Sequence, residues 1–378
     1  MVGLRAAPVL RRVAGLCLGL ATVVACDNSV AAREAVAGTE ALIVVESRVV
    51  ATGLAGVVGA VGTSDGAVAV ADGGAASLTV FRSGRPPVVI GRKGSGPGEF
   101  RMLYRLHLCG SDTLIAYDFE GKLQVFSDTA LVRSIQLPAQ LAVSDFVGCT
   151  SANDLIFTKP PNRIPGVGVH FLPLTVFRFS LEGESIEWLA NLRGSEMFIS
   201  EQHQSFYERP FGSRSFVAAG VGGVASAESD RLELRTLESA GMFETQFFFS
   251  TSTRAPKSTE LNRYKSDRVA EEPDSASRKT IRAVLDEAPP GKSLPEIDRL
   301  VASSSGAFWL RRAPLAADSL VEWLVIDGPS AIVQRIMLDR SLRVQFVDSS
   351  RVLVLREAAD GYDQLLELAY RRQDGSRP

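Results

Sequence analysis

Residues 64–100 read SDGAVAVADGGAASLTVFRSGRPPVVIGRKGSGPGEF, and this stretch decides the fold prediction. A turn at 64–66 precedes an apolar strand at 67–72, a Gly-Gly turn follows at 73–74, and residues 77–82 return as a second strand. Short strands rich in β-branched residues and bounded by Gly, Asp and Ser are typical of antiparallel sheets. We interpret the stretch as one antiparallel unit in which the strand at 67–72 is innermost.

The same unit recurs along the chain at a spacing of ~40–45 residues, which is typical of the blades of a β-propeller. The later strand pairs lie at 114–118 and 122–127, 154–158 and 175–184, 216–223 and 231–241, 304–312 and 319–327, and 341–347 and 350–357. The pattern predicts an all-β protein with a six-bladed β-propeller over residues 41–372 and a tail at 373–378.

Two segments differ from the repeat. The strand at 41–50 (ALIVVESRVV) belongs to no other unit, and the sixth unit is one strand short, so we expect this N-terminal strand to close the last blade. Residues 254–303 are charged and have helical spacing, with Ile281, Val284 and Leu285 on one helical face. We predict a helical insertion between blades four and five.

The N-terminus has the parts of a bacterial signal peptide. Three arginines precede an uncharged, mostly apolar stretch at 13–25, which is too short to span a bilayer. Residues 23–26 read VVAC and resemble a lipobox, in which Cys26 receives the lipid after cleavage. We predict a lipoprotein signal peptide at 1–25 and a lipidated tether at 26–40. The alternative is an ordinary signal peptide with an incidental Cys.

Charge and cysteine content restrict the partners. Removing residues 1–25 takes away three of the 41 basic residues and none of the 43 acidic ones, so the net charge changes from −2 to −5. This mild acidity argues against nucleic acid as the main partner, because phosphate binding needs a basic surface. Cys109 and Cys149 either pair in an oxidising compartment or remain two separate buried thiols. The three histidines are too scattered for a zinc site, and we expect no cofactor.

The glycine-rich turn at 91–100 (GRKGSGPGEF) carries a family resemblance, together with Asp72 and Val80-Phe81 in the strands before it. These residues resemble the turn and preceding strands of bacterial six-bladed β-propeller lipoproteins related to the NHL-repeat proteins. The segment SSSGAFWLRR at 303–312 is similar to a tryptophan-containing strand of that family. The resemblance covers most of the chain and implies the propeller fold, but it assigns no activity.

The residues around this turn have structural interpretations. We expect the glycines to adopt positive φ, Glu99 to bind turn amides and Phe100 to pack between sheets. Basic residues near the turn are interpreted as solvated strand ends, with a patch for anions as the alternative. They are Arg82, Arg85, Arg92, Lys93, Arg101 and Arg105.

Charged residues also follow the strands predicted to be innermost. Their alternating signs disfavour a metal-binding ring, and two interpretations stay open: solvated rim charges, or a site at one rim for a polar ligand. The residues are Asp72, Asp118, Lys159, Arg311 and Glu357.

These features predict a monomeric binding or interaction propeller in the cell envelope. We expect a lipid anchor in the membrane, with the propeller in the periplasm or at the cell surface and an unknown protein or small molecule as ligand. The alternative is a propeller enzyme of the lactonase or lyase type, acting at the central channel. A structural member of a surface complex is a third possibility. The sequence favours binding, because it contains no evident convergent set of catalytic acids and histidines.

Overall fold

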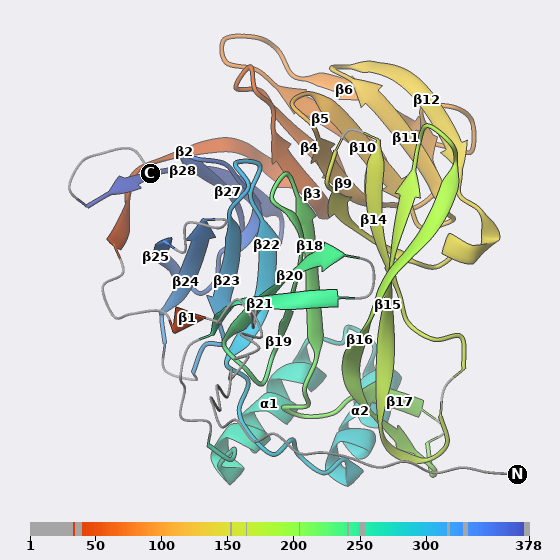
Figure 1. The fold of residues 1–378 in the computed structure, drawn as a ribbon, viewed down its shortest axis with the longest axis vertical. Helices are drawn as coiled ribbons and strands as arrows, with labels where there is room; N and C mark the ends of the chain where they lie inside the picture. The colour runs from red at the N-terminus through yellow and green to blue at the C-terminus, as the bar shows by residue number, and fades with distance from the viewer. Residues whose placement is uncertain are drawn as a thin grey trace, which may run out of the picture. The chain divides into compact units, whose positions relative to one another are not determined.

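The computed structural model describes residues 33–34, 40–151, 153–163, 165–203, 205–239, 242–248, 254–315, 318–327 and 332–373. Cys26, the predicted signal peptide and most of the predicted tether lie outside these residues. The described chain consists mainly of β-strands, with two α-helices and one short 3₁₀ helix (Figure 1). None of its helices has the length and apolar character needed to cross a membrane.

The first two sheets each contain four consecutive antiparallel strands. One contains β3 Val57–Gly62, β4 Val68–Asp72, β5 Ser77–Phe81 and β6 Val88–Ile90, and the other contains β9 Leu103–Cys109, β10 Thr113–Asp118, β11 Lys122–Ser127 and β12 Ala130–Gln136. Between them, the short strands β7 Arg92–Lys93 and β8 Glu99–Phe100 pair in parallel.

The glycine-rich turn between these sheets has the predicted structure. Glu99 accepts a hydrogen bond from the Gly96 amide at 2.9 Å and another from Arg92 Nε at 2.8 Å. Phe100 is fully buried in the core shared by the first two sheets. Gly91 has φ +78°, a backbone conformation that glycine adopts without steric cost. The structural interpretation is confirmed for Glu99, Phe100 and three of the glycines, whereas Gly96 does not have a positive φ.

A third sheet contains ten strands. In sheet order they are β1 Arg33–Glu34, β21 Met242–Phe248, β20 Glu233–Ser239, β19 Gly223–Glu228, β18 Ser215–Gly220, β13 Asp145–Cys149, β14 Asp154–Lys159, β15 Gly168–Ser180, β16 Ser185–Ser200 and β17 Ser205–Glu208. Strands β13 and β18 join its two halves through the parallel pair Gly148 and Ala219. A Cβ at Gly148 would lie 2.3 Å from the Ala219 carbonyl oxygen, so this approach requires glycine.

The C-terminal sheet contains eight strands. Its order is β22 Ile297–Ala302, β23 Phe308–Arg312, β24 Leu320–Asp327, β25 Ile332–Asp339, β2 Glu40–Leu54, β28 Asp363–Arg372, β27 Arg351–Glu357 and β26 Arg343–Val347. Strand β2 pairs antiparallel with β28 and, at its start, parallel with β25. The N-terminal strand thus joins the strands of the C-terminus, as the sequence predicts.

Six strands face a common cavity: β3, β9, β13, β18, β22 and β26. Contacts link β3 to β9, β9 to β13, β13 to β18, β18 to β22, and β26 back to β3. Sheets that surround a shared channel are the defining feature of a β-propeller. The strand content and this arrangement agree with the predicted all-β propeller.

The prediction that the strand at 67–72 is innermost is wrong. Residues of β3 line the cavity, whereas β4 is the second strand from it. The glycines of β3 make its sequence resemble a loop. Near the axis of the propeller, however, the inner strands lie close together, and glycine fits where a larger side chain would clash. A Cβ at Gly59 would lie 3.0 Å from Leu106 of β9. The inner strand β22, at 297–302, lies inside the charged segment 254–303 that the sequence predicts to be helical, so the prediction is wrong there as well.

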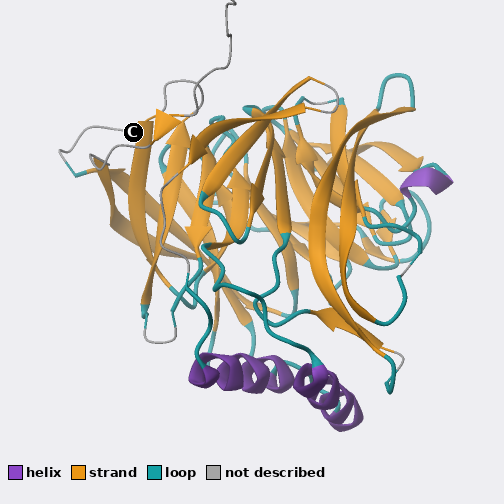
Figure 2. Cartoon of the chain, turned by 60° about the horizontal axis from the view of Figure 1, so that its bottom comes forward, coloured by secondary structure: helices purple, strands orange, loops and turns teal. Residues whose placement is uncertain are grey.

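The segment between β21 and β22 forms two helices, α1 Ser258–Ala270 and α2 Ser275–Glu287. They lie across one end of the strands (Figure 2). Ile281, Val284 and Leu285 are buried, which confirms the predicted apolar face of the second helix. These side chains give α2 a hydrophobic attachment, although most residues of both helices are exposed or half-buried.

Candidate functional site

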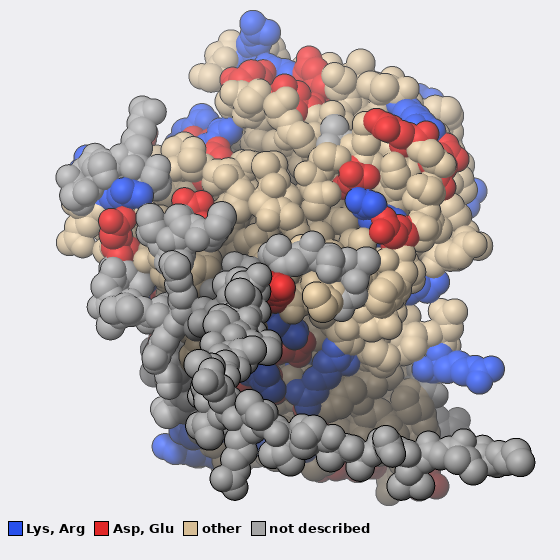
Figure 3. Space-filling model, in the orientation of Figure 1, with Lys and Arg blue, Asp and Glu red and all other residues tan. Residues whose placement is uncertain are grey.

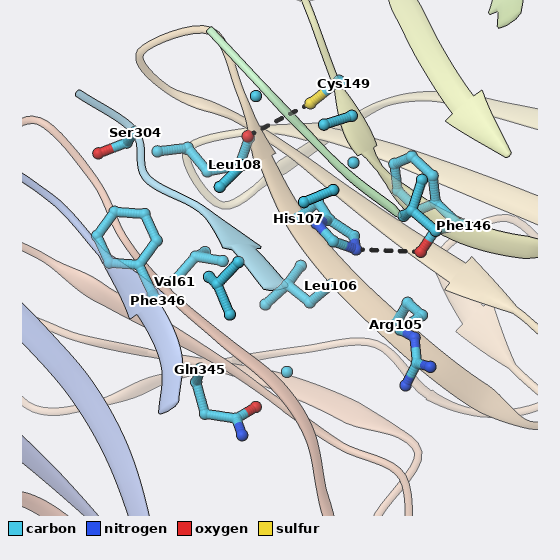
Figure 4. Close-up of a pocket in the computed structure, with 18 of the residues that line it drawn as sticks. Val61, Arg105, Leu106, His107, Leu108, Phe146, Cys149, Ser304, Gln345 and Phe346 are labelled. Atoms are coloured by element: carbon cyan, nitrogen blue, oxygen red, sulfur yellow. Dashed lines mark hydrogen bonds between the residues drawn. The ribbon is translucent and has the colours of Figure 1, made fainter. Parts of the chain in front are cut away.

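A cavity of about 300 Å³ lies between the six inner strands. Its middle is apolar: Figure 4 shows Val61, Leu106, Leu108 and Phe346 around the same space. Because the side chains of a strand alternate between its two faces, each inner strand sends only some of its residues toward the cavity. The walls therefore combine short segments that lie far apart in the sequence.

The cavity has a charged end, where the inner strands begin. Among the described residues, the charged ones that line it are Arg105 of β9, Asp145 of β13 and Arg299 of β22. The Nε atom of Arg105 lies 3.2 Å from Oδ1 of Asp145, and a second guanidinium nitrogen lies 3.4 Å from Oδ2. Arg105 and Gln345 lie toward the same end in Figure 4. Two arginines against one aspartate leave the lining with a net charge of +1.

Arg299 has no hydrogen bond or ion pair to its side chain within the described residues. Burial lowers the pKa of its guanidinium, and the charge of Arg311 lowers it further. Arginine stays protonated in proteins, so the half-buried group keeps its positive charge. An unpaired cation away from bulk water is costly, and this makes Arg299 the most unusual residue of the cavity.

His107 lies deeper in the cavity than Arg105 on the same strand. Burial lowers the pKa of its ring to about 4, and the neighbouring Arg105 charge acts in the same direction. The ring is therefore neutral at pH 7. Its Nε2 lies 3.2 Å from the Phe146 carbonyl oxygen (Figure 4). Nε2 must donate this bond, which leaves Nδ1 as the unprotonated acceptor.

The opposite end of the cavity is tied together across neighbouring strands. Cys109 of β9 and Cys149 of β13 form a disulfide, with Cα atoms 5.6 Å apart. The sequence left pairing and separate thiols open, and the structure has the pair. The amide of Ser304 donates to the Val347 carbonyl oxygen at 2.9 Å, and the hydroxyl of Ser303 donates to the same oxygen at 3.1 Å. These bonds join the end of β22 to β26.

Two of the predicted rim residues have structural partners. Asp72 accepts hydrogen bonds from the amides of Ala55 at 3.0 Å and Ala75 at 2.9 Å. Asp118 is almost completely buried and accepts from the amides of Arg101 at 2.7 Å and Met102 at 3.3 Å, before β9, and from the amide of Glu120 in its own turn. Both carboxylates therefore hold the connections at the ends of β4 and β10.

The other three rim residues also lie apart from one another. Lys159 donates to the Gln140 carbonyl oxygen at 2.7 Å, and Arg311 Nε lies 3.3 Å from Asp298 Oδ1. Glu357 is exposed at the end of β27. No hydrogen bond or ion pair joins any two of the five rim residues in the part of the chain that the structure describes. These five residues were predicted to end the innermost strands, but all five lie at or next to the end of a strand that is second from the cavity, which explains their separation.

Most residues of the proposed anion patch pair with acids. Figure 3 shows basic and acidic side chains next to one another on the face it presents. The pairs are Arg82 with Asp128, Arg92 with Glu99, Arg101 with Glu120 and Arg105 with Asp145. Arg105, interpreted from sequence as a solvated strand end, instead lines the cavity.

Sequence reasoning missed Arg299, Asp145 and His107 as residues of a shared site. A signal was present in β9, where Arg105 and His107 occupy alternate positions of an otherwise apolar strand, LYRLHLC. Alternate positions share a face, so two polar side chains on one face of an inner strand indicate a polar cavity wall. Arg299 had no such signal, because it lay in the segment assigned to helix.

No protein-family model matches the chain, and no curated protein matches it significantly. The chain is similar to the solved structure of virginiamycin B lyase from Staphylococcus aureus, with 9% identity, a TM-score of 0.44 and coverage of 87% of this chain and 99% of that one. It is also similar to the RRP9 WD40 repeats, with 10% identity, a TM-score of 0.46 and coverage of 88% and 99%. A luciferin-regenerating enzyme shows 7% identity, a TM-score of 0.41 and coverage of 86% and 95%. These likenesses are too distant to assign a family, an activity or a partner.

Proposed function

We propose that this protein is an envelope-tethered, six-bladed β-propeller that binds a ligand in its central cavity. The observation that carries the proposal is the cavity itself. Six inner strands line it, and one of them presents a charged side chain, Arg299, that the described fold leaves unpaired. Small-molecule sites are typically concave, with a few placed polar groups that fix the orientation of the ligand.

The pairing of the strands supports a count of six blades. Each cavity-lining strand begins a run of antiparallel neighbours, and the runs are β3–β6, β9–β12, β13–β16, β18–β21, β22–β25 and β26–β28. Only the last run is one strand short, and β2 supplies the outer position next to β28. A closed ring leaves fewer exposed sheet edges, which favours a soluble monomer.

The tether rests on the lipobox-like sequence that ends at Cys26. The disulfide between Cys109 and Cys149 supports export, since such bonds persist in oxidising compartments. Cys26→Ser should move the protein from the membrane fraction to the soluble periplasmic fraction, or leave it uncleaved. Membrane association of a correctly processed Cys26→Ser protein would refute the anchor.

Binding in the cavity is tested by filling it. Gln345→Trp introduces a large side chain at a half-buried position of the cavity wall, and Val132→Trp introduces the same residue at an exposed position of β12. Native mass spectrometry of protein purified from its own membranes should show a small bound molecule in the wild type and in Val132→Trp, but not in Gln345→Trp. Equal occupancy in all three proteins would place the ligand elsewhere.

A second candidate is catalysis at the channel by a lactonase- or lyase-type enzyme, and His107 favours it. Its neutral ring faces the cavity, with Nδ1 available to accept a proton. Ring opening of a simple lactone such as δ-valerolactone, followed by proton release, tests this activity. Turnover that His107→Gln abolishes would support the enzyme, and the same rate in both proteins would exclude His107 as the base.

A further inference from the structure

We propose that the charged end of the cavity binds the carboxylate of a small monoanion, with Arg299 as its main contact and the apolar walls around the rest of the molecule. This inference rests on the proposed function, because it assumes that the cavity is the ligand site. It adds the chemical class of the ligand and the residue that recognises it.

The first support comes from the neighbouring arginines, each of which has its own acid. Arg105 pairs with Asp145 and Arg311 pairs with Asp298. Arg343, on the adjacent inner strand, pairs with Asp363. Arg299 lies directly opposite Arg311 in the register of β22 and β23, and like charges in that position repel. The fold thus places Arg299 without a hydrogen-bonded or ion-paired acid of its own, and the nearby Asp298, which pairs with Arg311, compensates its charge only in part.

The charge balance of the cavity indicates the sign and the magnitude of the ligand's charge. The charged residues of the lining sum to +1, and His107 is neutral at pH 7 because burial holds its pKa at about 4. A single negative charge would neutralise the cavity. A dianion such as a phosphate monoester would carry more charge than the walls compensate, so the balance favours a monoanion.

The geometry of the Arg299 guanidinium favours a carboxylate as its partner. A guanidinium presents parallel N–H donors that match the two oxygens of a carboxylate, and the resulting bidentate pair is strong when water is excluded. Arg105 already makes a pair of this kind with Asp145 at the same end of the cavity. Arg299 offers the same donor arrangement to a ligand.

The walls of the cavity indicate the size and polarity of the rest of the ligand. Below the charged end the cavity is lined by apolar side chains, among them Val61, Leu106, Val301 and Phe346. A space of about 300 Å³ corresponds to roughly ten water molecules at about 30 Å³ each. The ligand class is therefore a short aliphatic or aromatic monocarboxylate, with its acid group at the end where β9, β13 and β22 begin.

The test compares probes that differ only in their charge or in their apolar part. Hexanoate, hexanamide, hexyl phosphate and acetate are titrated into the purified protein by isothermal titration calorimetry. Hexanoate should bind at least tenfold more tightly than hexanamide, hexyl phosphate or acetate.

Arg299→Met should reduce hexanoate affinity to that of hexanamide, and Arg299→Lys should retain part of the difference. Arg343→Met is the matched control and should leave the preference intact, since Arg343 lies outside the cavity lining. Melting temperatures of the variants show whether each one is folded.

The outcomes separate this inference from the proposed function. Equal binding of hexanoate and hexanamide, abolished for both by Gln345→Trp, would retain the cavity as a ligand site and overturn the carboxylate inference. Tighter binding of hexyl phosphate would likewise overturn it in favour of a phosphate ligand. Acetate as tight as hexanoate would remove the role of the apolar walls. Binding of hexanoate that Gln345→Trp leaves unchanged would overturn both proposals.

Discussion

The two ends of the cavity differ in how their side chains contribute to the fold. At the end where the inner strands finish, a disulfide joins β9 to β13 and Ser303 and Ser304 join β22 to β26. At the end where they begin, the wall carries Arg105, Asp145 and an unpaired Arg299. One end has bonds between blades, whereas the other retains a charged side chain that forms no hydrogen bond or ion pair within the described residues.

This difference separates residues that hold the fold from residues available to a ligand. Binding sites are regions where a protein retains locally unfavourable features, and stability is supplied elsewhere. We therefore expect that substitutions at the end with the disulfide and Ser303, here called the tied end, reduce the free energy of unfolding. Removal of the unpaired charge should reduce ligand binding and leave stability unchanged or higher.

The largest effect is expected at the disulfide. Cys109→Ala with Cys149→Ala opens a loop with a sequence separation of 40 residues, and loop entropy alone predicts a loss of about 4 kcal/mol from the free energy of unfolding. Urea denaturation of the wild type and the double variant measures the loss. Adding a reductant should weaken the wild type and not the variant. A loss below about 1 kcal/mol would show that the covalent link contributes little to this end.

A pH-dependent effect is expected at His107, between the two ends. Its folded pKa of about 4 lies below the ordinary 6.5, so the unfolded chain takes up a proton first as the pH falls. The contribution to stability is complete above pH 6.5 and is lost as the pH decreases toward 4. With a discount for the ring's partial exposure to the cavity, the loss is about 2 kcal/mol.

The variant His107→Gln removes this titration and leaves an amide able to donate to the Phe146 carbonyl. Urea midpoints for both proteins at intervals between pH 4 and pH 7 measure the effect. Their difference should change across this range, with the wild type losing more stability. Parallel curves would show that His107 keeps an ordinary pKa in the folded protein.

A smaller effect is expected at Ser303, which is almost completely buried. Ser303→Ala removes the hydroxyl that donates to the Val347 carbonyl oxygen and also accepts from the Ser305 amide at 3.1 Å. The loss should be about 1 kcal/mol, the usual net contribution of such a bond. Ser350→Ala, at an exposed turn, is the control and should change the urea midpoint much less. Equal losses in both variants would argue against a special role for the tied end.

The fold was more predictable from sequence than the site. The turn at 91–100 and the strand at 41–50 were recognisable because local chemistry fixes them: glycines for positive φ, and an apolar strand without a partner in its own unit. The innermost strands β3 and β13 were not recognisable, because crowding near the axis selects small residues such as Gly59 and Gly148 that resemble loop residues in sequence.

The charged end was hidden for a related reason. Arg105, Asp145 and Arg299 come from three different sheets and line one cavity only because the inner strands surround a common space. No spacing along the chain reflects that arrangement. The rim aspartates, in contrast, repeat at matching strand ends and were easily noticed. Asp72 and Asp118 repeat for a structural reason, because each binds an amide of the segment 17 residues earlier and an amide of its own turn.

The smallest change in stability, and the sharpest test of the comparison, is expected at Arg299. Replacing it with Met keeps much of the side-chain volume and removes a half-buried charge that has no partner within the described fold. It also relieves repulsion with Arg311 across the strand pair. The free energy of unfolding should stay within about 0.5 kcal/mol of the wild type or rise by up to about 1 kcal/mol, because apolar replacement of a buried charge is often neutral or stabilising. Arg351→Met is the matched control: Arg351 donates to Asp348 at 2.6 Å and to Glu367 at 3.1 Å. Its loss removes the arginine partner of Asp348 and one of the two arginines that bind Glu367, and should clearly destabilise the protein. Urea denaturation without ligand compares the two variants. A large loss in Arg299→Met, similar to that in Arg351→Met, would mean that the fold itself compensates the Arg299 charge, and the distinction between the two ends would no longer hold.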